Sequence, residues 1–218
     1  KEWSFGYREN DRLGGHDPYS ASKAGAEIAI NSWKMCFSNK KNNHKSNLYI
    51  ATARSGNVIG GGDWAENRLI PDIVRALKRK EKLIIRNPKA TRPWQHVLEP
   101  LNGYLLLAEK LLKNPHKYCE PFNFGPDLNS NRNVGEVVNY VFQHWPGEME
   151  ILEKDQNLHE ANLLHIQSDK AKKILGWSTK WDFERTIYET ISWYKDINNG
   201  EDEFSKCQEN IYSYVENS

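Results

Sequence analysis

Several long segments of the chain repeat hydrophobic residues every three or four positions, which is typical of helices that pack one face against a core. The first such segment runs from Tyr19 to about Ser38 and is rich in Ala, Glu, Lys and Ile. Its apolar face is predicted to carry Ala24, Ile28, Ala29 and Trp33. The same pattern predicts further helices at 71–79, 98–112, 134–145, 169–175, 182–198 and 202–215. In the helix at 182–198, one side is expected to carry Phe183, Ile187, Ile191 and Tyr194.

Short apolar runs bounded by turn residues lie between these helices and predict strands. They cover residues 48–54, 83–86, 121–126 and 149–152. A helix followed by a buried strand is typical of a βαβ unit, whose strands are parallel. We therefore expect an α/β fold with a parallel sheet.

The charge balance and the cysteines limit the classes of function. The 218 residues include 30 Lys and Arg against 29 Asp and Glu, so a net charge of +1 gives no reason to expect nucleic acid or a membrane as partner. No apolar run in the sequence approaches the length of a membrane span. The three cysteines are far apart and form no CxxC, which indicates a reducing, cytoplasmic compartment and argues against a disulfide framework or a metal site.

Tyr19 and Lys23 lie four residues apart at the predicted start of the first helix. Pro18 suits a helix entrance, because its φ is fixed and the N–H that it lacks is not needed there. Positions i and i+4 share a helix face, so the phenol and the ammonium should point the same way. An ammonium near a phenol favours the phenolate, which can accept a proton near neutral pH. Because the same spacing also occurs by chance in ordinary helices, the pair alone leaves both interpretations open.

Two further features are candidates for ligand binding. Glycines cluster between Gly56 and Gly62, after the strand predicted at 48–54, and open α/β sheets bind ligands beyond the carboxyl ends of their strands. A flexible surface loop is the alternative. Arg92 could bind a phosphate through two hydrogen bonds or form an ordinary surface ion pair. The nearby His96 is predicted to be structural.

Four motifs follow one another along the chain: Tyr19-Ser-Ala-Ser-Lys23, Arg54-Ser-Gly-Asn57-Val-Ile-Gly60, Arg68-Leu-Ile-Pro71 and Arg92-Pro-Trp-Gln-His96-Val. Together they resemble the extended short-chain dehydrogenase/reductase family of nucleotide-sugar epimerases and dehydratases. Within that family, Gly60-Gly-Gly-Asp-Trp64 and the Arg92 motif are the most specific, and they favour the 4,6-dehydratases. The resemblance covers residues 1 to about 198.

The resemblance implies an NAD cofactor and 4,6-dehydration of CDP-glucose or a related nucleotide sugar. Tyr19 would take the proton of the sugar C4 hydroxyl, Lys23 would hold the nicotinamide ribose, and both would contact the cofactor. The substrate would be bound by Asn57, Arg68, Leu69, Ile85, Arg86, Arg92, His159 and Glu160. The product, a 4-keto-6-deoxy sugar nucleotide, would serve the synthesis of dideoxyhexoses for surface polysaccharide.

The sequence departs from the family pattern at the cofactor site. It contains no glycine-rich G-x-x-G-x-x-G turn, which in this family binds the NAD pyrophosphate at a helix N-terminus. The acid/base pair that the family places ahead of the segment beginning at Lys1 is also absent. We therefore expect the chain to be the C-terminal part of such an enzyme, either as a fragment or with the rest supplied by another chain. By itself it is expected to be inactive.

The resemblance also implies a division into domains. Residues 1–56 and 91–118 would form the remaining part of a Rossmann-type NAD-binding domain with a parallel sheet. Residues 57–90 and 119–200 would form a smaller, mixed α/β domain that binds the sugar nucleotide, and residues 201–218 a tail or helix. A homo-oligomer, either a dimer or a tetramer, is expected. Two alternatives stay open: another epimerase or dehydratase of the family, and a non-catalytic fragment that only binds sugar nucleotide.

Overall fold

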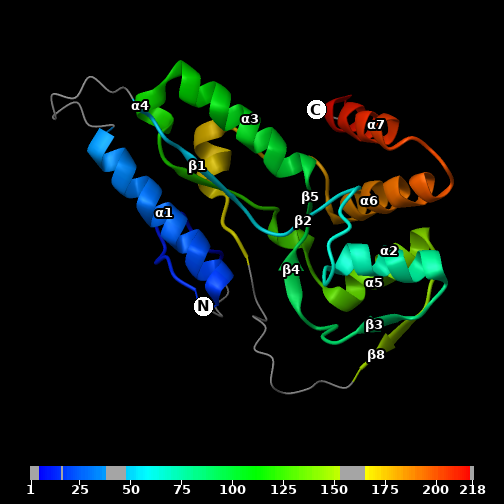
Figure 1. The fold of residues 1–218 in the computed structure, drawn as a ribbon. Helices are drawn as coiled ribbons and strands as arrows, with labels where there is room; N and C mark the ends of the chain where they lie inside the picture. Colours follow the sequence, from blue (N-terminus) through cyan, green and yellow to red (C-terminus); the bar gives the residue numbers. More distant parts are fainter. Residues whose placement is uncertain (1–4, 16, 38–47, 153–164, 217–218) are drawn as a thin grey trace.

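Two clusters of buried hydrophobic residues organise the fold. They are seen in a computed structural model that describes residues 5–15, 17–37, 48–152 and 165–216 (Figure 1). The elements are, in chain order, α1 (Pro18–Phe37), β1 (Thr52–Ser55), β2 (Val58–Ile59), α2 (Leu69–Arg79), β3 (Leu83–Ile85), β4 (Thr91–Pro93), β5 (Gln95–His96), α3 (Leu98–Lys113), α4 (Pro115–Tyr118), β6 (Pro121–Phe124), the 3₁₀ turn η1 (Leu128–Ser130), β7 (Asn131–Asn133), α5 (Val134–His144), β8 (Met149–Ile151), the π-helical turn η2 (Ala171–Leu175), α6 (Phe183–Asn198) and α7 (Glu203–Glu216).

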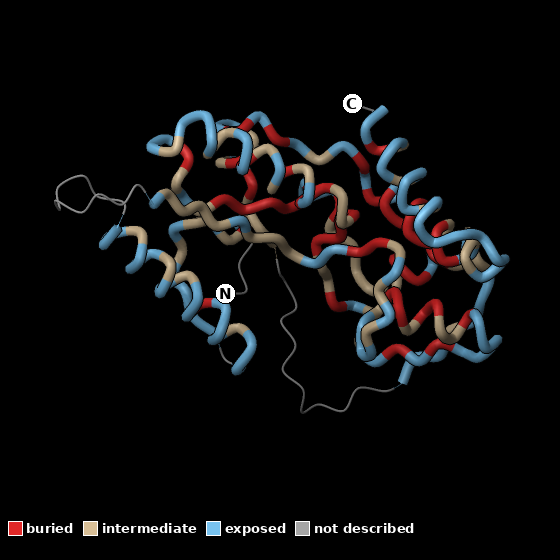
Figure 2. The backbone as a smooth tube through the Cα atoms, turned by 45° about the horizontal axis from the view of Figure 1, so that its top comes forward, coloured by how far each residue is buried: buried red, intermediate tan, exposed pale blue. Residues whose placement is uncertain are grey.

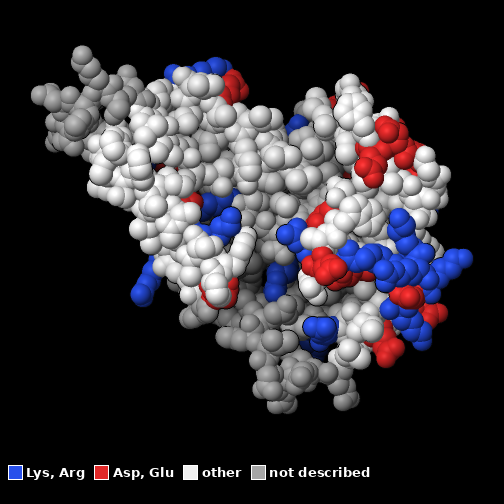
Figure 3. Space-filling view, viewed as in Figure 1, with Lys and Arg blue, Asp and Glu red and all other residues white. Residues whose placement is uncertain are grey.

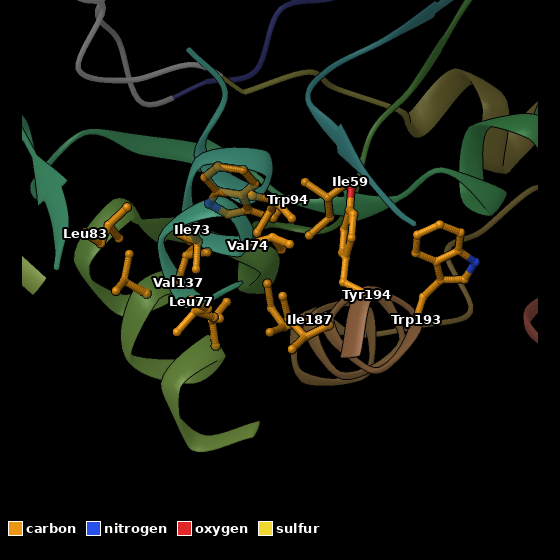
Figure 4. Close-up of a cluster of buried hydrophobic side chains, with 14 of the residues drawn as sticks. Ile59, Ile73, Val74, Leu77, Leu83, Trp94, Val137, Ile187, Trp193 and Tyr194 are labelled. Carbon is orange, nitrogen blue, oxygen red and sulfur yellow. The ribbon is translucent and has the colours of Figure 1, made fainter. Parts of the chain in front are cut away.

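The first cluster lies between α2, α5 and α6 and is completed by β2, β3 and the residues around Trp94 (Figure 4). The periodicity at 182–198 is confirmed, because α6 buries Phe183, Ile187, Ile191 and Tyr194. Asp182 starts this helix by accepting the backbone N–H of Arg185 at 2.8 Å. Val137 and Val141 on α5 and Ile73 on α2 are completely buried against it.

The second cluster lies between α3, β6 and η2 and contains Leu107, Tyr118, Phe122, Phe124, Ala171, Leu175 and Trp177. Gly103 lets α3 approach β6 closely, because a Cβ at this position would lie 2.3 Å from the Phe124 ring. Trp177 meets the same ring edge-on, with 5.1 Å between the ring centroids. The division of the chain into domains stays a prediction, while the two clusters show where buried contacts concentrate.

Within the described ranges, the strands pair in four short ladders, three of them parallel. β1 pairs with β6, β2 with β5 and β3 with β8 in parallel, whereas β4 and β7 are antiparallel. The predicted α/β class with parallel strands is confirmed. The boundaries of the first strand were wrong, because residues 48–51 lie outside β1 and the ladder with the four-residue β6 runs only from Thr52 to Ser55. The segment 91–97, for which no strand was predicted, contains β4 and β5.

Helix α1 forms at the predicted position but packs lightly. Ala24 is its one buried residue within the part of the chain that the structure describes, and Figure 2 shows the helix exposed along most of its length. Ile28 and Trp33, expected on the apolar face, are 61% and 59% exposed. Among the described helices, none has both the length and the apolar character needed to cross a membrane.

A buried carboxylate ties the last helix to the rest of the fold. Glu99 at the start of α3 accepts the backbone N–H of Trp181 at 2.8 Å and the hydroxyl of Tyr214 on α7 at 2.8 Å. Burial raises the pKa of Glu99, although these hydrogen bonds oppose the shift. The helix predicted at 202–215 is therefore confirmed as α7, and its Tyr214 is held in the interior.

Candidate functional site

The first two turns of α1 place Tyr19 and Lys23 together, as their spacing predicts. Asp17 accepts the backbone N–H of Ser20 at 2.9 Å and its hydroxyl at 2.5 Å, and so holds the helix start. These two bonds lower the pKa of the Asp17 carboxyl. The Nζ atom of Lys23 lies 5.7 Å from the centroid of the Tyr19 ring, and Tyr19 is 73% exposed. The pair can therefore reach a molecule bound beside the helix.

The glycine loop after β2 is fixed by packing and by hydrogen bonds. Gly61 lies against Trp193 of α6, and a Cβ there would be 2.1 Å from the indole ring. The Tyr194 hydroxyl donates to the carbonyl oxygen of Asp63 at 2.7 Å, and burial raises the pKa of Tyr194 to about 12. This loop is therefore anchored to α6. The alternative interpretation of the sequence, a flexible surface loop, does not describe it.

Asp63 and Arg68 close the far end of the same loop. The guanidinium of Arg68 donates to the Asp63 carboxylate at 3.0 Å, and the backbone N–H of Ala65 donates to its other oxygen at 3.0 Å. Burial raises the pKa of Asp63, but these two hydrogen bonds and the positive charges of Arg68 and Arg75 lower it overall. The side chain of Arg68 is 66% exposed at the start of α2, and Asn57 is exposed between β1 and β2.

The remaining predicted substrate residues of α2 and β3 differ in exposure. Leu69 is half-buried and packs against the first cluster. Ile85 is 5% exposed, and its carbonyl oxygen accepts the backbone N–H of Leu152 at 3.0 Å. Arg86, the next residue, is exposed. Arg86 thus has the freedom to contact a ligand, whereas the Ile85 side chain is committed to the core.

Arg92 lies on β4 directly opposite Arg132 on β7. Opposite residues of an antiparallel pair point to the same face with their Cβ atoms about 5 Å apart. Arg132 donates to the carbonyl oxygens of Asn129 at 2.6 Å and Asn131 at 3.0 Å, and its guanidinium lies 5.3 Å from the Phe183 ring centroid. Lys and Arg side chains also gather along the middle of the face shown in Figure 3, between the half that carries α1 and the half that carries α2.

His96 is interior, in agreement with the structural role predicted for it. Its exposure is 2%, and Nδ1 accepts the backbone N–H of Leu98 at 3.3 Å. Burial lowers the pKa of His96 to about 4. His159 and Glu160, predicted to contact the substrate, lie outside the described residues. A pocket of about 370 Å³ is lined by other residues, namely Arg8, Glu9, Asn10, Gln167, Asp169 and Lys170.

Comparison with known proteins decides the family. The family model for GDP-mannose 4,6 dehydratase matches residues 3–190, which is most of the chain. The chain belongs to this family.

Curated relatives of this member of the GDP-mannose 4,6-dehydratase family include sugar-nucleotide dehydratases. CDP-glucose 4,6-dehydratase of Salmonella typhimurium is 40% identical over 216 residues, which are 99% of this chain and 60% of that protein. The dTDP-glucose 4,6-dehydratase of Escherichia coli is 25% identical over 186 residues, which are 81% of this chain and 47% of that protein. The chain thus spans 60% or less of the length of these two relatives.

Solved structures share the fold of this family member. The dTDP-glucose 4,6-dehydratase DesIV of Streptomyces venezuelae matches 90% of the chain with a TM-score of 0.72 and 19% identity, over 56% of its own length. The Bacillus anthracis dTDP-glucose 4,6-dehydratase matches 90% with a TM-score of 0.71 and 20% identity, over 58% of its own length. The Rossmann-type α/β class is confirmed.

Two features of the candidate site were not predicted from the sequence of this family member. Arg132 belongs to the polar strand Asn131–Asn133, which has no apolar pattern, so only the pairing register reveals that it faces Arg92. Glu27 follows Lys23 by four residues and forms an ion pair with Arg54. Its helical spacing was a usable signal, because it places Glu27 on the side of α1 that carries Lys23.

Proposed function

We propose that this protein, in its complete form, catalyses the NAD-dependent dehydration of CDP-D-glucose to CDP-4-dehydro-6-deoxy-D-glucose. The observation that carries the proposal is the 40% identity to the Salmonella CDP-glucose 4,6-dehydratase along 99% of the chain. The proposed reaction oxidises C4 of the sugar, eliminates water across C5 and C6, and reduces C6. Its product would supply dideoxyhexose synthesis for surface polysaccharide such as O-antigen.

In this proposal Tyr19 accepts the proton of the C4 hydroxyl. Its exposed ring lies at the start of α1, where a bound sugar can approach it. The Lys23 Nζ atom lies 5.7 Å from the ring centroid, so its positive charge is held beside the phenol. A positioned base of this kind contributes about 10²–10⁴-fold to the rate.

The same pair fits the nicotinamide ribose of NAD by the chemistry of its donors. Lys23 offers three N–H donors and Tyr19 a hydroxyl, both on one face of α1, and ribose hydroxyls can accept bonds from both. When bound there, NAD⁺ would supply a reversible hydride acceptor. Lys23 would then act both on the cofactor and on the base.

The arginines and the glycine loop are proposed to hold the substrate. Arg92 and Arg68 would bind the diphosphate, because guanidinium groups bind phosphate oxygens with charge-assisted, paired hydrogen bonds. Arg132 faces Arg92 and would add a second positive charge at the same place. The other proposed contacts are Asn57, Leu69 and Arg86, together with His159 and Glu160. Ile85, which is 5% exposed, would act by supporting Arg86.

The wider context is also proposed. Residues 1–56 and 91–118 would belong to the NAD-binding domain, and residues 57–90 and 119–200 to the sugar-nucleotide domain. The protein would act in the cytoplasm, where its substrate and cofactor are made, and as a dimer or tetramer.

Turnover of CDP-glucose tests the proposed reaction. The complete protein, incubated with CDP-glucose and NAD⁺, should form a 4-keto product lighter than the substrate by one water, as mass spectrometry would show. The rice UDP-glucose 4-epimerase 3, 27% identical over 154 residues, makes epimerisation the second candidate. A product of unchanged mass would favour epimerisation, and no conversion would contradict both reactions for this substrate.

A further inference from the structure

Glu27 continues the helix face that carries Tyr19 and Lys23. The three residues follow at intervals of four, so each lies about one turn beyond the last. Glu27 therefore occupies the side of α1 from which the proposed base and its lysine project. Any residue that holds the Glu27 side chain in place therefore also fixes the rotation of α1 about its axis.

Strand β1 supplies two partners for Glu27. Arg54 Nη2 donates to Glu27 Oε2 at 2.6 Å, and Thr52 Oγ1 donates to the same oxygen at 3.1 Å. Thr52 and Arg54 are two positions apart on the strand, so their side chains share one face of β1. The side chains of Arg54 and Glu27 are only 22% and 19% exposed. A pair shielded from water to this degree is weakened less by salt than a surface pair.

Arg54 also connects α1 with the segment that precedes it. Its Nη1 donates to the carbonyl oxygen of Glu9 at 3.1 Å, while Glu9 Oε1 accepts the backbone N–H of Asn123 at 2.9 Å. The Asn123 amide donates to the carbonyl oxygen of Tyr7 at 3.0 Å. One polar network therefore joins α1, β1, β6 and residues 7–9.

The light packing of α1 gives this network its importance. Within the described residues Ala24 is the one buried residue of the helix, so apolar contacts with these residues give little control over its rotation about its axis. The directional bonds at Glu27 supply that control, since they require one oxygen to face two donors at once.

We propose that Glu27 and Arg54 are positioning residues, which hold α1 at the rotation that presents Tyr19 and Lys23 to the substrate. The proposal rests on the proposed function of Tyr19 as the base. Neither Glu27 nor Arg54 would touch the reacting atoms, and both would act through the placement of the helix. A displacement of about 1 Å at the base can lower a rate about a hundredfold.

The experiment compares Glu27→Ala and Glu27→Gln in the complete protein with CDP-glucose and NAD⁺. Glu27→Ala removes the oxygen, whereas Glu27→Gln keeps an acceptor of the same length without the charge. We expect kcat to fall about tenfold to a hundredfold in Glu27→Ala. The KM for CDP-glucose should stay within about twofold of the wild type, since the substrate contacts lie elsewhere. In Glu27→Ala the acid limb of the pH–rate profile should move to higher pH. Glu27→Gln should keep most of the kcat that Glu27→Ala loses.

Glu109→Gln serves as the matched control. Glu109 forms an ion pair with Lys113 on the exposed surface of α3, and its loss should leave kcat and the profile unchanged. If Glu27→Ala merely lowers the melting temperature and keeps the wild-type kcat and profile, the positioning role is refuted.

Hydrogen exchange of residues 18–30 gives a readout that does not depend on turnover. The positioning role predicts faster exchange in this part of α1 for Glu27→Ala, with wild-type rates elsewhere. Unchanged exchange in α1 would overturn it. An inactive wild-type protein would instead contradict the proposed function, and the exchange comparison would still decide the role of Glu27.

Discussion

Arg92 and Arg132 lie directly opposite each other on the antiparallel strands β4 and β7. Like charges at directly opposite positions disfavour a strand pair, unless something between or beside them offsets the repulsion. Arg92 donates to the carbonyl oxygen of Thr91 at 2.9 Å, and Arg132 donates to the carbonyl oxygens of Asn129 and Asn131. The two guanidinium groups are proposed to bind the substrate diphosphate together.

Removing either guanidinium should weaken diphosphate binding. We expect Arg92→Gln and Arg132→Gln each to weaken binding of CDP by about tenfold or more, because a hydrogen bond to a charged group contributes about 1.5–3 kcal/mol. Calorimetry with CDP and with cytidine would separate the phosphate contacts from the base contacts, and cytidine binding should not change. Arg79→Gln is the matched control, since Arg79 is 66% exposed at the end of α2. If Arg132→Gln binds CDP as the wild type does, Arg132 serves only the turn at 129–131.

Loss of the Tyr19 hydroxyl should slow turnover strongly without destabilising the fold. Tyr19→Phe should lower kcat by about 10²–10⁴-fold, the range of a positioned acid or base. Tyr19 is 73% exposed, so the melting temperature should stay close to that of the wild type. Tyr212→Phe on α7 is a matched control, with a phenol that is 63% exposed. Comparable kcat values for Tyr19→Phe and the wild type would remove Tyr19 from the mechanism.

A methyl group at Gly61 should disturb the glycine loop. Because a Cβ there would lie 2.1 Å from the Trp193 ring, Gly61→Ala should lower the free energy of unfolding by about 1–3 kcal/mol. Gly14→Ala is the control, since no atom lies within 4 Å of a Cβ at that position. Thermal unfolding of both variants would test the contact, and equal stability would show that the loop can move away from α6 at little cost.

Acid should destabilise the fold through His96. The folded-state pKa of about 4 lies below the ordinary value of 6.5, so between these pH values the unfolded chain binds a proton that the folded chain does not. The contribution of the neutral His96 to the free energy of unfolding is therefore complete above pH 6.5 and is lost as the pH falls towards 4. Its full loss should lower the free energy of unfolding by about 3 kcal/mol. Urea unfolding between pH 4 and 7 should show a shallower pH dependence for His96→Gln than for the wild type. Equal slopes would contradict the burial of a neutral imidazole.

The long amphipathic helices could be predicted from the sequence, because the spacing of apolar residues within each helix is enough to identify it. In α6 the apolar positions recur at helical spacing, and Ile187 and Ile191 are completely buried. The strands β3, β6 and β8 were predicted from apolar runs, whereas β2, β4, β5 and β7 were not. β4 and β7 have three residues each, include Pro93 and Arg132, and exist because they pair across about 40 residues of chain.

The candidate site was likewise predictable only where its residues are close in the sequence. The Tyr19–Lys23 pair follows from local helix geometry and lies as expected. The contact of Glu27 with Arg54 joins residues that are distant in the sequence, and neither residue type indicates the other. The burial of the Ile85 side chain likewise depends on residues distant in the sequence, because Ile85 belongs to the cluster formed with α2, α5 and α6.

The fate of the C4 hydrogen tests the central claim most directly. CDP-glucose carrying deuterium at C4 would be converted by the complete protein with NAD⁺, and the product examined by mass spectrometry and NMR. An internal hydride cycle predicts a product that has lost one water and carries the deuterium in its C6 methyl group. Deuterium that remains at C4, deuterium lost to solvent, or a product that keeps the mass of the substrate would contradict it.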